Sequence, residues 1–115
     1  MASSINTFKS YAVNVTTSPN TFYTSPVDAT TIVLLAQATN VGSIDANVTF
    51  YTSIVTVPET IPPTDTEIVK DYTIPVGDAA GLLTGKLVLE PGISMSVVGN
   101  ANATIKLTVS ILETR

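Results

Sequence analysis

The segment from residue 104 to residue 112, TIKLTVSIL, alternates apolar and polar side chains, and this period of two constrains the fold more than any other feature. Such alternation is typical of a β-strand with one face in a core, which places Ile105, Leu107, Val109 and Ile111 inward. No segment of ten or more residues shows the period of about 3.6 residues that is typical of an amphipathic helix. The sequence therefore predicts an all-β chain.

Further segments rich in β-branched and aromatic residues lie between turn-forming residues, and each predicts another strand. These segments are residues 11–16, 21–24, 30–39, 46–56, 67–74, 86–89 and 93–97. Seven or eight short antiparallel strands in a chain of 115 residues favour a single β-sandwich of jelly-roll or immunoglobulin-like topology, with a small barrel as the structural alternative.

Two stretches of the sequence allow more detailed predictions. The run TTIVLLAQAT, residues 30–39, is apolar at both odd and even positions, so we expect it to be buried on both faces. In KLVLEPGISMSV, residues 86–97, Pro91 and Gly92 match the centre of a type II turn between two apolar alternations. This second pattern predicts a hairpin.

The length of the chain suits one domain. Residues 1–10 are polar and aperiodic, which predicts an N-terminal arm, disordered or docked on a neighbour, ahead of a β-sandwich domain over residues 11–115. The prolines between residues 58 and 63 predict a stiff, extended loop, which is either a contact arm for a neighbouring subunit or an ordinary connection. The candidate assembly contacts in the arm and the loop are Phe8, Pro58, Ile61, Pro62 and Pro63.

Charged residues make up 12% of the chain, about half of the roughly 25% of an average soluble domain. A monomer this poor in charge has to cover its surface with Ser, Thr, Asn and apolar groups, which favours burial against partner chains. The five Lys and Arg residues are scattered and the net charge is -4, so we expect no nucleic acid and no membrane among the partners.

The chain has no cysteine and no histidine, which removes disulfides, thiolate sites and the side chain most often used for proton transfer. Asp65, Glu67 and Asp71 lie close together in sequence but lack the ligand order of a calcium loop. The abundant Ser and Thr lack an accompanying base, and the glycines from 77 to 85 lack the order of a phosphate-binding loop. We therefore expect no catalytic, metal-binding or cofactor-binding residues and no enzymatic activity.

Two adjacent aromatic pairs, Phe22-Tyr23 and Phe50-Tyr51, send their rings to opposite faces if each pair lies in a strand. One ring of each pair then belongs to the core, and Tyr23 and Tyr51 are the candidate exposed aromatics. Exposed tyrosines suit a sugar-stacking platform or an anchor at a protein interface. A carbohydrate-binding or host-adhesion β-sandwich module is therefore the alternative to a purely structural role.

The second half of the chain contains four short motifs in a fixed order, which are I-V-K at 68–70, I-P-V-G at 74–77, K-L-V-L-E-P-G at 86–92 and S-I-L-E-T at 110–114. This order resembles that of small structural proteins of tailed bacteriophages, especially cyanophage-like ones. Ile93 departs from the pattern, because such proteins often have Asp after the turn glycine. A side-chain cap of the turn is lost with that change.

The resemblance implies a non-enzymatic virion structural protein, either a homo-oligomeric capsid decoration or cement subunit or an accessory subunit of the neck, tail or baseplate. The partners that it implies are further copies of the chain, a trimer being one arrangement, and other virion proteins. It implies no cofactor. The implied location is the virion, assembled in the cytoplasm of a host bacterium.

Overall fold

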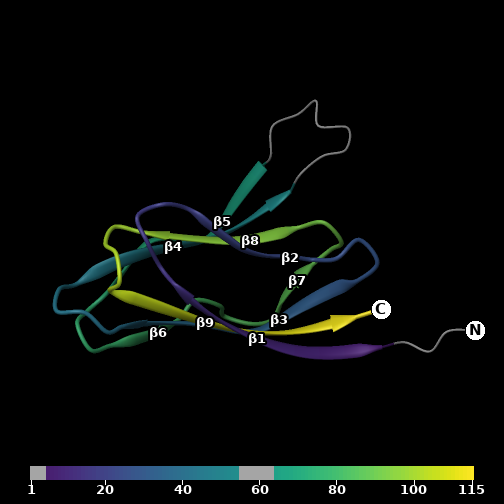
Figure 1. The fold of residues 1–115 in the computed structure, drawn as a ribbon, viewed down its shortest axis with the longest axis horizontal. Coiled ribbons are helices and arrows are strands. Elements are labelled where there is room, and N and C mark those ends of the chain that lie inside the picture. Colours follow the sequence, from purple (N-terminus) through teal and green to yellow (C-terminus); the bar gives the residue numbers. More distant parts are fainter. Residues whose placement is uncertain (1–4, 55–63) are drawn as a thin grey trace, which may run out of the picture.

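The computed structural model describes residues 5–54 and 64–115, and every regular element in this part of the chain is a β-strand (Figure 1). The strands are β1 (Asn6–Asn14), β2 (Asn20–Thr24), β3 (Thr30–Asn40), β4 (Ala46–Ile54), β5 (Thr64–Ile74), β6 (Ala79–Gly81), β7 (Leu87–Leu89), β8 (Ser94–Gly99) and β9 (Ile105–Thr114). The all-β prediction is confirmed. No helix in the described residues is long and apolar enough to cross a membrane.

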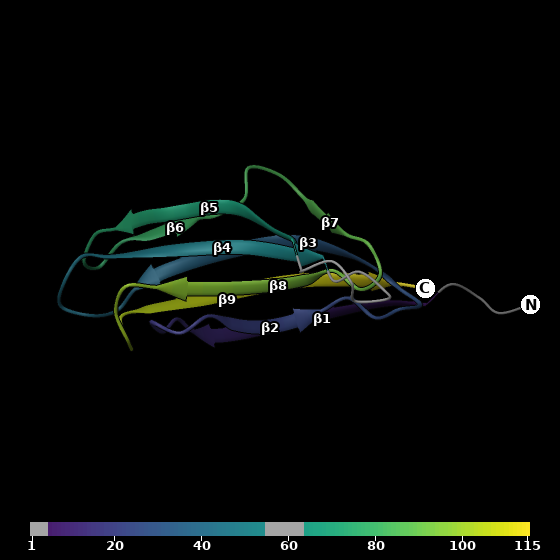
Figure 2. The ribbon, with the colours of Figure 1, turned by 90° about the horizontal axis from the view of Figure 1, so that it is seen from above.

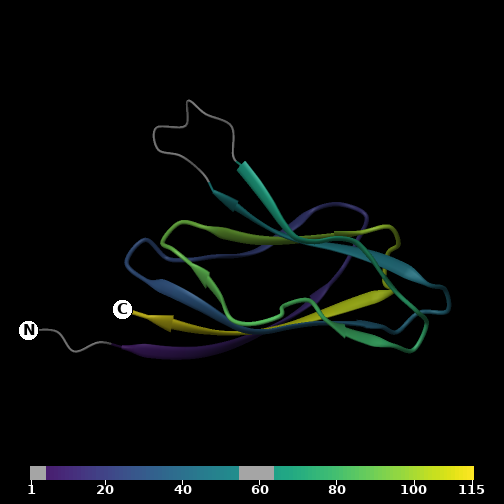
Figure 3. The same ribbon diagram turned by 180° about the vertical axis from the view of Figure 1, so that it is seen from behind.

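The strands form two antiparallel sheets that lie one above the other (Figures 1 and 3). Sheet A has the order β1-β9-β3, and both β6 and β7 pair with the far edge of β3. Sheet B has the order β2-β8-β4-β5. Phe50 of sheet B and Leu107 and Ile111 of sheet A are fully buried between them. The predicted β-sandwich is confirmed.

The chain crosses between the sheets at every step except within the β4–β5 hairpin and between β6 and β7, which identifies the topology as a jelly roll. The chain passes from β1 in sheet A to β2 in sheet B, returns to β3, and crosses again to the hairpin β4–β5. It then returns to β6 and β7, crosses to β8 and ends with β9 in sheet A. In the immunoglobulin topology, by contrast, several consecutive strands share a sheet. β6 and β7 together fill one strand position, which the connection of residues 82–86 interrupts.

The turn at Pro91-Gly92 has the predicted geometry but not the predicted role. Gly92 has a φ of 87°, and the Ile93 N–H donates to the Glu90 carbonyl at 3.1 Å, as in a type II turn. However, β7 before the turn pairs in sheet A and β8 after it pairs in sheet B. The predicted hairpin is therefore wrong, because the backbone around the turn bonds instead to Ser25 of the β2–β3 connection, twice at 2.9 Å.

A β-bulge explains the two-sided apolar pattern of β3. The register with β9 shifts between Val33 and Leu35, so one extra residue reverses the facing of the strand. Val33 and Ala36 both point into the core, whereas Leu34 and Leu35 are 38% and 41% exposed. The prediction of burial on both faces is wrong for this reason.

β1 begins at Asn6, so residues 6–10 of the predicted arm are part of sheet A, and residues 1–4 lie outside the described residues. β1 pairs with β9 over its whole length without a register shift. Sequence periodicity missed residues 6–10 because none of them is buried. Edge strands keep their place through backbone hydrogen bonds, which leave no apolar alternation in the sequence.

Candidate functional site

The outer face of sheet A carries a continuous apolar row across its four strand positions. Phe8 of β1 lies opposite Leu112 of β9, Leu112 lies opposite Ile32 of β3, and Ile32 lies opposite Val88 of β7. These side chains point away from the core, since they alternate with residues that point into it. We refer to these four residues as the apolar row.

The apolar row is accessible and almost free of charge. Phe8 and Val88 at its ends are 72% and 56% exposed, and the two central residues are half-buried. Leu34 and Leu35 at the bulge of β3 extend the apolar surface beside the row. Lys106 is the one charged side chain among the outward-facing strand residues of β1, β3, β7 and β9. Exposed apolar side chains with few charges are typical of the centre of a protein interface.

An open hollow of about 380 Å³ lies beside Leu34 and Leu35. The connection between β6 and β7 forms its other wall through Leu83, Thr84 and Lys86. The lining is mainly aliphatic and contains one charged group, so it offers no acid–base pair. The hollow therefore extends the apolar surface of sheet A.

The outer face of sheet B is polar instead. The hydroxyl oxygens of Thr21 and Ser96 lie 2.7 Å apart across β2 and β8, and the Ser53 hydroxyl donates to Asp65 at 2.6 Å across β4 and β5. β5 carries further carboxylates. Exposed hydrophobic residues also occur in sheet B, where Ile54 of β4 and Tyr72 of β5 are 47% and 48% exposed, but the apolar row belongs to sheet A.

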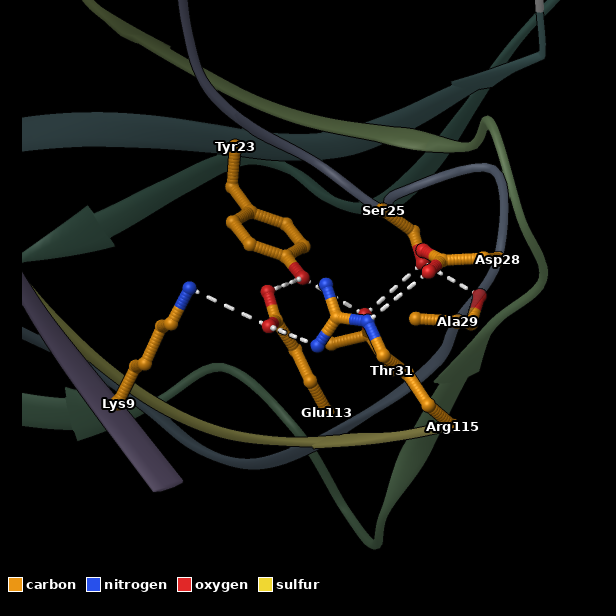
Figure 4. A network of polar contacts seen from close by, with 8 residues as sticks. All are labelled: Lys9, Tyr23, Ser25, Asp28, Ala29, Thr31, Glu113 and Arg115. Carbon is orange, nitrogen blue, oxygen red and sulfur yellow. Dashed lines mark hydrogen bonds and ion pairs between the residues drawn. The ribbon is translucent and has the colours of Figure 1, made fainter. Parts of the chain in front are cut away.

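A buried cluster of polar side chains lies between the sheets near the end of β9 (Figure 4). Glu113 is 1% exposed, and its Oε2 accepts a hydrogen bond from the Tyr23 hydroxyl at 2.5 Å. Lys9 Nζ and Arg115 Nη1 lie 3.2 and 3.5 Å from Oε1 of the same carboxylate. One neutral donor and two cations thus compensate the buried charge.

Hydroxyl groups extend this cluster toward the β2–β3 connection. The oxygens of Tyr23 and Thr31 are 2.7 Å apart, and those of Thr31 and Ser25 are 2.9 Å apart. Every buried side-chain nitrogen and oxygen in the described part of the chain has a hydrogen-bond partner. The cluster therefore joins β1, β2, β3 and β9 in one satisfied network.

The surroundings of Glu113 and Tyr23 lower the pKa of the first group and raise the pKa of the second. The hydrogen bond from Tyr23 first, and then Lys9 and Arg115, hold the pKa of Glu113 below its usual value, although burial alone raises it. Burial first, and then the hydrogen bond to Glu113, raise the pKa of Tyr23. At neutral pH, Glu113 is therefore an ionised acceptor and Tyr23 a neutral donor.

The residues of the polar cluster lie apart from the two open hollows. The hollow beside Leu34, and a second one of about 320 Å³ between β5 and the β6–β7 connection, contain none of its residues. Its carboxylate already has donors on both oxygens. Across residues 5–54 and 64–115, no group of three or more acidic side chains is placed to hold a metal ion.

The structure corrects the prediction of an exposed Tyr23, which is 7% exposed. A register shift between Thr21 and Tyr23 turns both Phe22 and Tyr23 toward the core. The Tyr23 ring lies 5.6 Å from the ring of Tyr11, and Phe22 stacks on Phe50 at 6.3 Å. The bulge is the physical reason, because it cancels the alternation on which the prediction depended.

The second aromatic pair divides between the faces as expected. Phe50 is fully buried, and Tyr51 is half-buried on the outer face of sheet B, opposite Ser96 of β8. With Tyr23 in the core, Tyr23 and Tyr51 do not form the shared sugar platform that the sequence suggested.

The predicted assembly contacts divide between two parts of the chain. Phe8 is the most exposed member of the apolar row, and its role as a contact stays a prediction. Pro58, Ile61, Pro62 and Pro63 lie outside the described residues.

Sequence reasoning missed Glu113 and its partner Lys9. The alternation that places Ile111 inward continues by two positions to Glu113, so strand parity alone could have identified the buried carboxylate. Lys9 gave no such signal, because β1 has no apolar alternation around it. The apolar row depends on the register between strands that are far apart in the sequence.

Comparison with known proteins relates this chain to others through its fold. No protein-family model and no curated protein sequence matches it. A chain of the T13 viral particle of IBDV superimposes with a TM-score of 0.60 at 7% sequence identity, over 95% of this chain and 31% of that chain. At this identity the likeness concerns the fold alone, and the present chain spans about a third of the length of that protein.

Two further structures give weaker likenesses. A chain from the structure of infectious bursal disease virus, Gx strain, has a TM-score of 0.49 at 6% identity, over 99% of this chain and 38% of that chain. A chain from the disulfide-linked pili of Bacillus endospore appendages has a TM-score of 0.49 at 11% identity, over 95% of this chain and 86% of that chain. TM-scores this low establish no relationship.

Proposed function

We propose that this chain is a non-enzymatic structural protein of a virus particle, which acts through protein–protein contacts made by the outer face of sheet A. More specifically, we propose that the chain is a homo-oligomeric capsid decoration or cement subunit, or a neck or tail accessory subunit, in the virion of a tailed bacteriophage. The observation that carries it is the apolar row, which crosses a whole sheet face with one charge on the strands around it.

The energetics of the apolar row favour contact with another protein. Phe8 and Val88 are mostly in water, and complete burial of one such side chain contributes about 1.5–3 kcal/mol. Four strand positions spaced by about 4.8 Å, with strands of about 30 Å, give a face of roughly 600 Å². Stable interfaces bury about 800 Å² per partner, so one such contact is of modest size. An oligomer that binds a particle through several such faces adds their contacts, which suits a homo-oligomeric subunit.

Two observations support a particle component over other structural roles. The motifs of the second half resemble those of small phage structural proteins, and they lie in strands and turns that build the sandwich. The fold-level likeness to a chain of the T13 IBDV viral particle supports the view that a sandwich of this type serves in particles. The buried polar cluster and the open aliphatic hollow offer no competing chemistry.

The test uses purified virions of the phage that carries the gene. If the chain is structural, mass spectrometry of washed particles finds it in a fixed ratio to the other particle proteins. Particles grown without it are then mixed with the purified chain, which should sediment with them in a saturable amount. A chain that is absent from washed virions, and that stays in the supernatant with these particles, would contradict the proposal.

A further inference from the structure

We propose that two copies of this chain join through the free edges of their β1 strands, antiparallel about a twofold axis at Ser10. The two A sheets then form one continuous sheet. This proposal deepens the proposed function, on whose self-association it rests, by naming the strand and the register that two copies share.

β1 is a long edge that lacks a partner on one side in the described chain. It pairs with β9 alone among residues 5–54 and 64–115, and it forms the margin of sheet A in Figure 2. Its nine residues pair with β9 in unbroken register, so the strand is regular along its whole length. A regular edge of this length is a template for another extended strand.

The hydrogen bonds to β9 reveal which backbone groups of β1 point outward. Ile5 and Arg115 exchange two hydrogen bonds, at 3.2 and 3.0 Å, and the Val15 N–H donates to the Ile105 carbonyl at 2.9 Å. Odd-numbered residues therefore bond to β9, since bonding alternates along an antiparallel pair. The N–H and C=O groups that point away from β9 belong to the even-numbered residues, which are Asn6, Phe8, Ser10, Ala12 and Asn14.

The other sheet edges carry features that oppose strand addition. β2 has five residues and a register shift, and β6 and β7 have three residues each. β5 is long, but its register with β4 shifts twice, Asp71 has a positive φ, and Asp65, Glu67 and Lys70 add charge. Short, bulged or charged strands are the usual protection of an edge. The one charged residue of β1, Lys9, turns inward to Glu113.

One register uses all the free groups of β1. If Ser10 lies opposite Ser10 of the other copy, Phe8 faces Ala12 and Asn6 faces Asn14, which gives roughly ten backbone hydrogen bonds. The large Phe8 side chain then lies beside a small one. Lys9 lies opposite Tyr11, whereas a register centred on Lys9 would oppose two like charges and lose a pair of residues at each end.

This pairing has a consequence for the apolar row. Even-numbered residues pair with even-numbered residues, so the outward side chains of both copies stay on one side of the joined sheet. The two apolar rows then lie on the same face, on either side of the axis. A dimer therefore presents two contact surfaces to one neighbour, which strengthens attachment without any new kind of contact.

The first test separates the backbone of Ser10 from its side chain. In a single copy its N–H points to solvent, so Ser10→Pro leaves the ladder with β9 intact and the monomer melts at a temperature close to that of the wild type. Proline removes the central hydrogen bonds of the dimer, and we expect dimerisation at least tenfold weaker by sedimentation velocity. The matched variant Ser10→Ala keeps the N–H and should dimerise like the wild type.

The second test detects the register directly. The chain has no cysteine, so Ser10→Cys introduces a single thiol. Opposed residues of a hydrogen-bonded antiparallel pair have Cα atoms about 5.5 Å apart, which lies within the range of disulfides. Oxidation should give a covalent dimer of Ser10→Cys. Thr73→Cys, an exposed residue on the β5 edge, should stay mostly monomeric under the same conditions.

The outcomes distinguish this proposal from the proposed function. A wild-type oligomer that Ser10→Pro does not weaken, or that Ser10→Cys does not cross-link, overturns pairing through β1 and leaves the contact role of the sheet face intact. A wild-type chain that remains monomeric at high concentration overturns the pairing as well. Incorporation into virions is measured separately, and its failure would overturn the proposed function.

Discussion

At the scale of single residues, the buried carboxylate of Glu113 depends on the donors around it. Its side chain is almost fully removed from water, and a carboxylate in such a place needs donors to replace its hydration. The side chains of Lys9 and Arg115 are 42% and 35% exposed, so solvent screens their ion pairs with Glu113. The Tyr23 hydroxyl lies inside the sandwich, and its hydrogen bond is therefore the main support of the carboxylate.

Replacement of Tyr23 by Phe tests this ranking. Tyr23→Phe keeps the ring in place but leaves Glu113 without its buried donor, and we expect the free energy of unfolding to fall by about 1–3 kcal/mol in urea titrations. Tyr72→Phe is the matched control, because the Tyr72 side chain is 48% exposed and its change should stay within about 0.5 kcal/mol. Equal losses in both variants would assign the effect to tyrosine hydroxyls in general.

The pH dependence of stability tests the charge of Glu113. Its pKa in the folded protein lies below the usual 4.5, so its contribution to stability is present above pH 4.5 and is lost as the pH falls through the folded value. Glu113→Gln should therefore be less stable than the wild type by about 1–3 kcal/mol at neutral pH. The difference should shrink in urea titrations below pH 4.5. A difference that persists unchanged in strong acid would show that the charge is not its cause.

Residue-scale predictions from the sequence succeeded where strands are regular. Ile105, Leu107, Val109 and Ile111 are all buried, as the alternation of that segment predicts. Tyr23 failed because a bulge is a backbone event that adds one residue, and neither its existence nor its position follows from the side chains around it.

At the scale of elements, the sequence located strands well but not their partners. Each predicted segment overlaps an observed strand, because β-branched residues and turn formers act locally. The choice of sheet is not local. The turn at Pro91-Gly92 could have closed a hairpin, and it crosses between sheets because its flanking backbone bonds to Ser25.

The turn itself gives a prediction about Gly92. Its φ of 87° lies in a region that side chains with a Cβ atom disfavour, so Gly92→Ala should lower the free energy of unfolding by about 1–2 kcal/mol. Gly81→Ala is the control, since Gly81 has no positive φ and a Cβ there would meet no atom within 4 Å. Thermal unfolding of the two variants should differ clearly. Similar melting temperatures would mean that the corner relaxes without cost.

At the scale of the whole molecule, the two faces of the sandwich have different compositions. Sheet B presents paired hydroxyls and carboxylates, whereas sheet A presents the apolar row, and Lys106 is the one charged side chain among the outward-facing residues of β1, β3, β7 and β9. The low charge content of the sequence indicated such a surface, but not its position. Phe8, Ile32, Val88 and Leu112 are brought into line only by the jelly-roll register.

This difference between the two faces predicts that the position of an apolar side chain matters more for binding to particles than its exposed area. Val88→Lys places a charge within the apolar row, where a partner would have to desolvate it, so binding to particles that lack the chain should weaken by about tenfold or more. Val27→Lys is the control, because Val27 is 89% exposed in the β2–β3 connection, outside the row. Both variants should keep wild-type melting temperatures, since neither side chain is in the core. The affinity comes from sedimentation of the particles over a range of chain concentrations. If Val27→Lys weakened binding as much as Val88→Lys, attachment would depend on general surface hydrophobicity, and the outer face of sheet A would lose its special role.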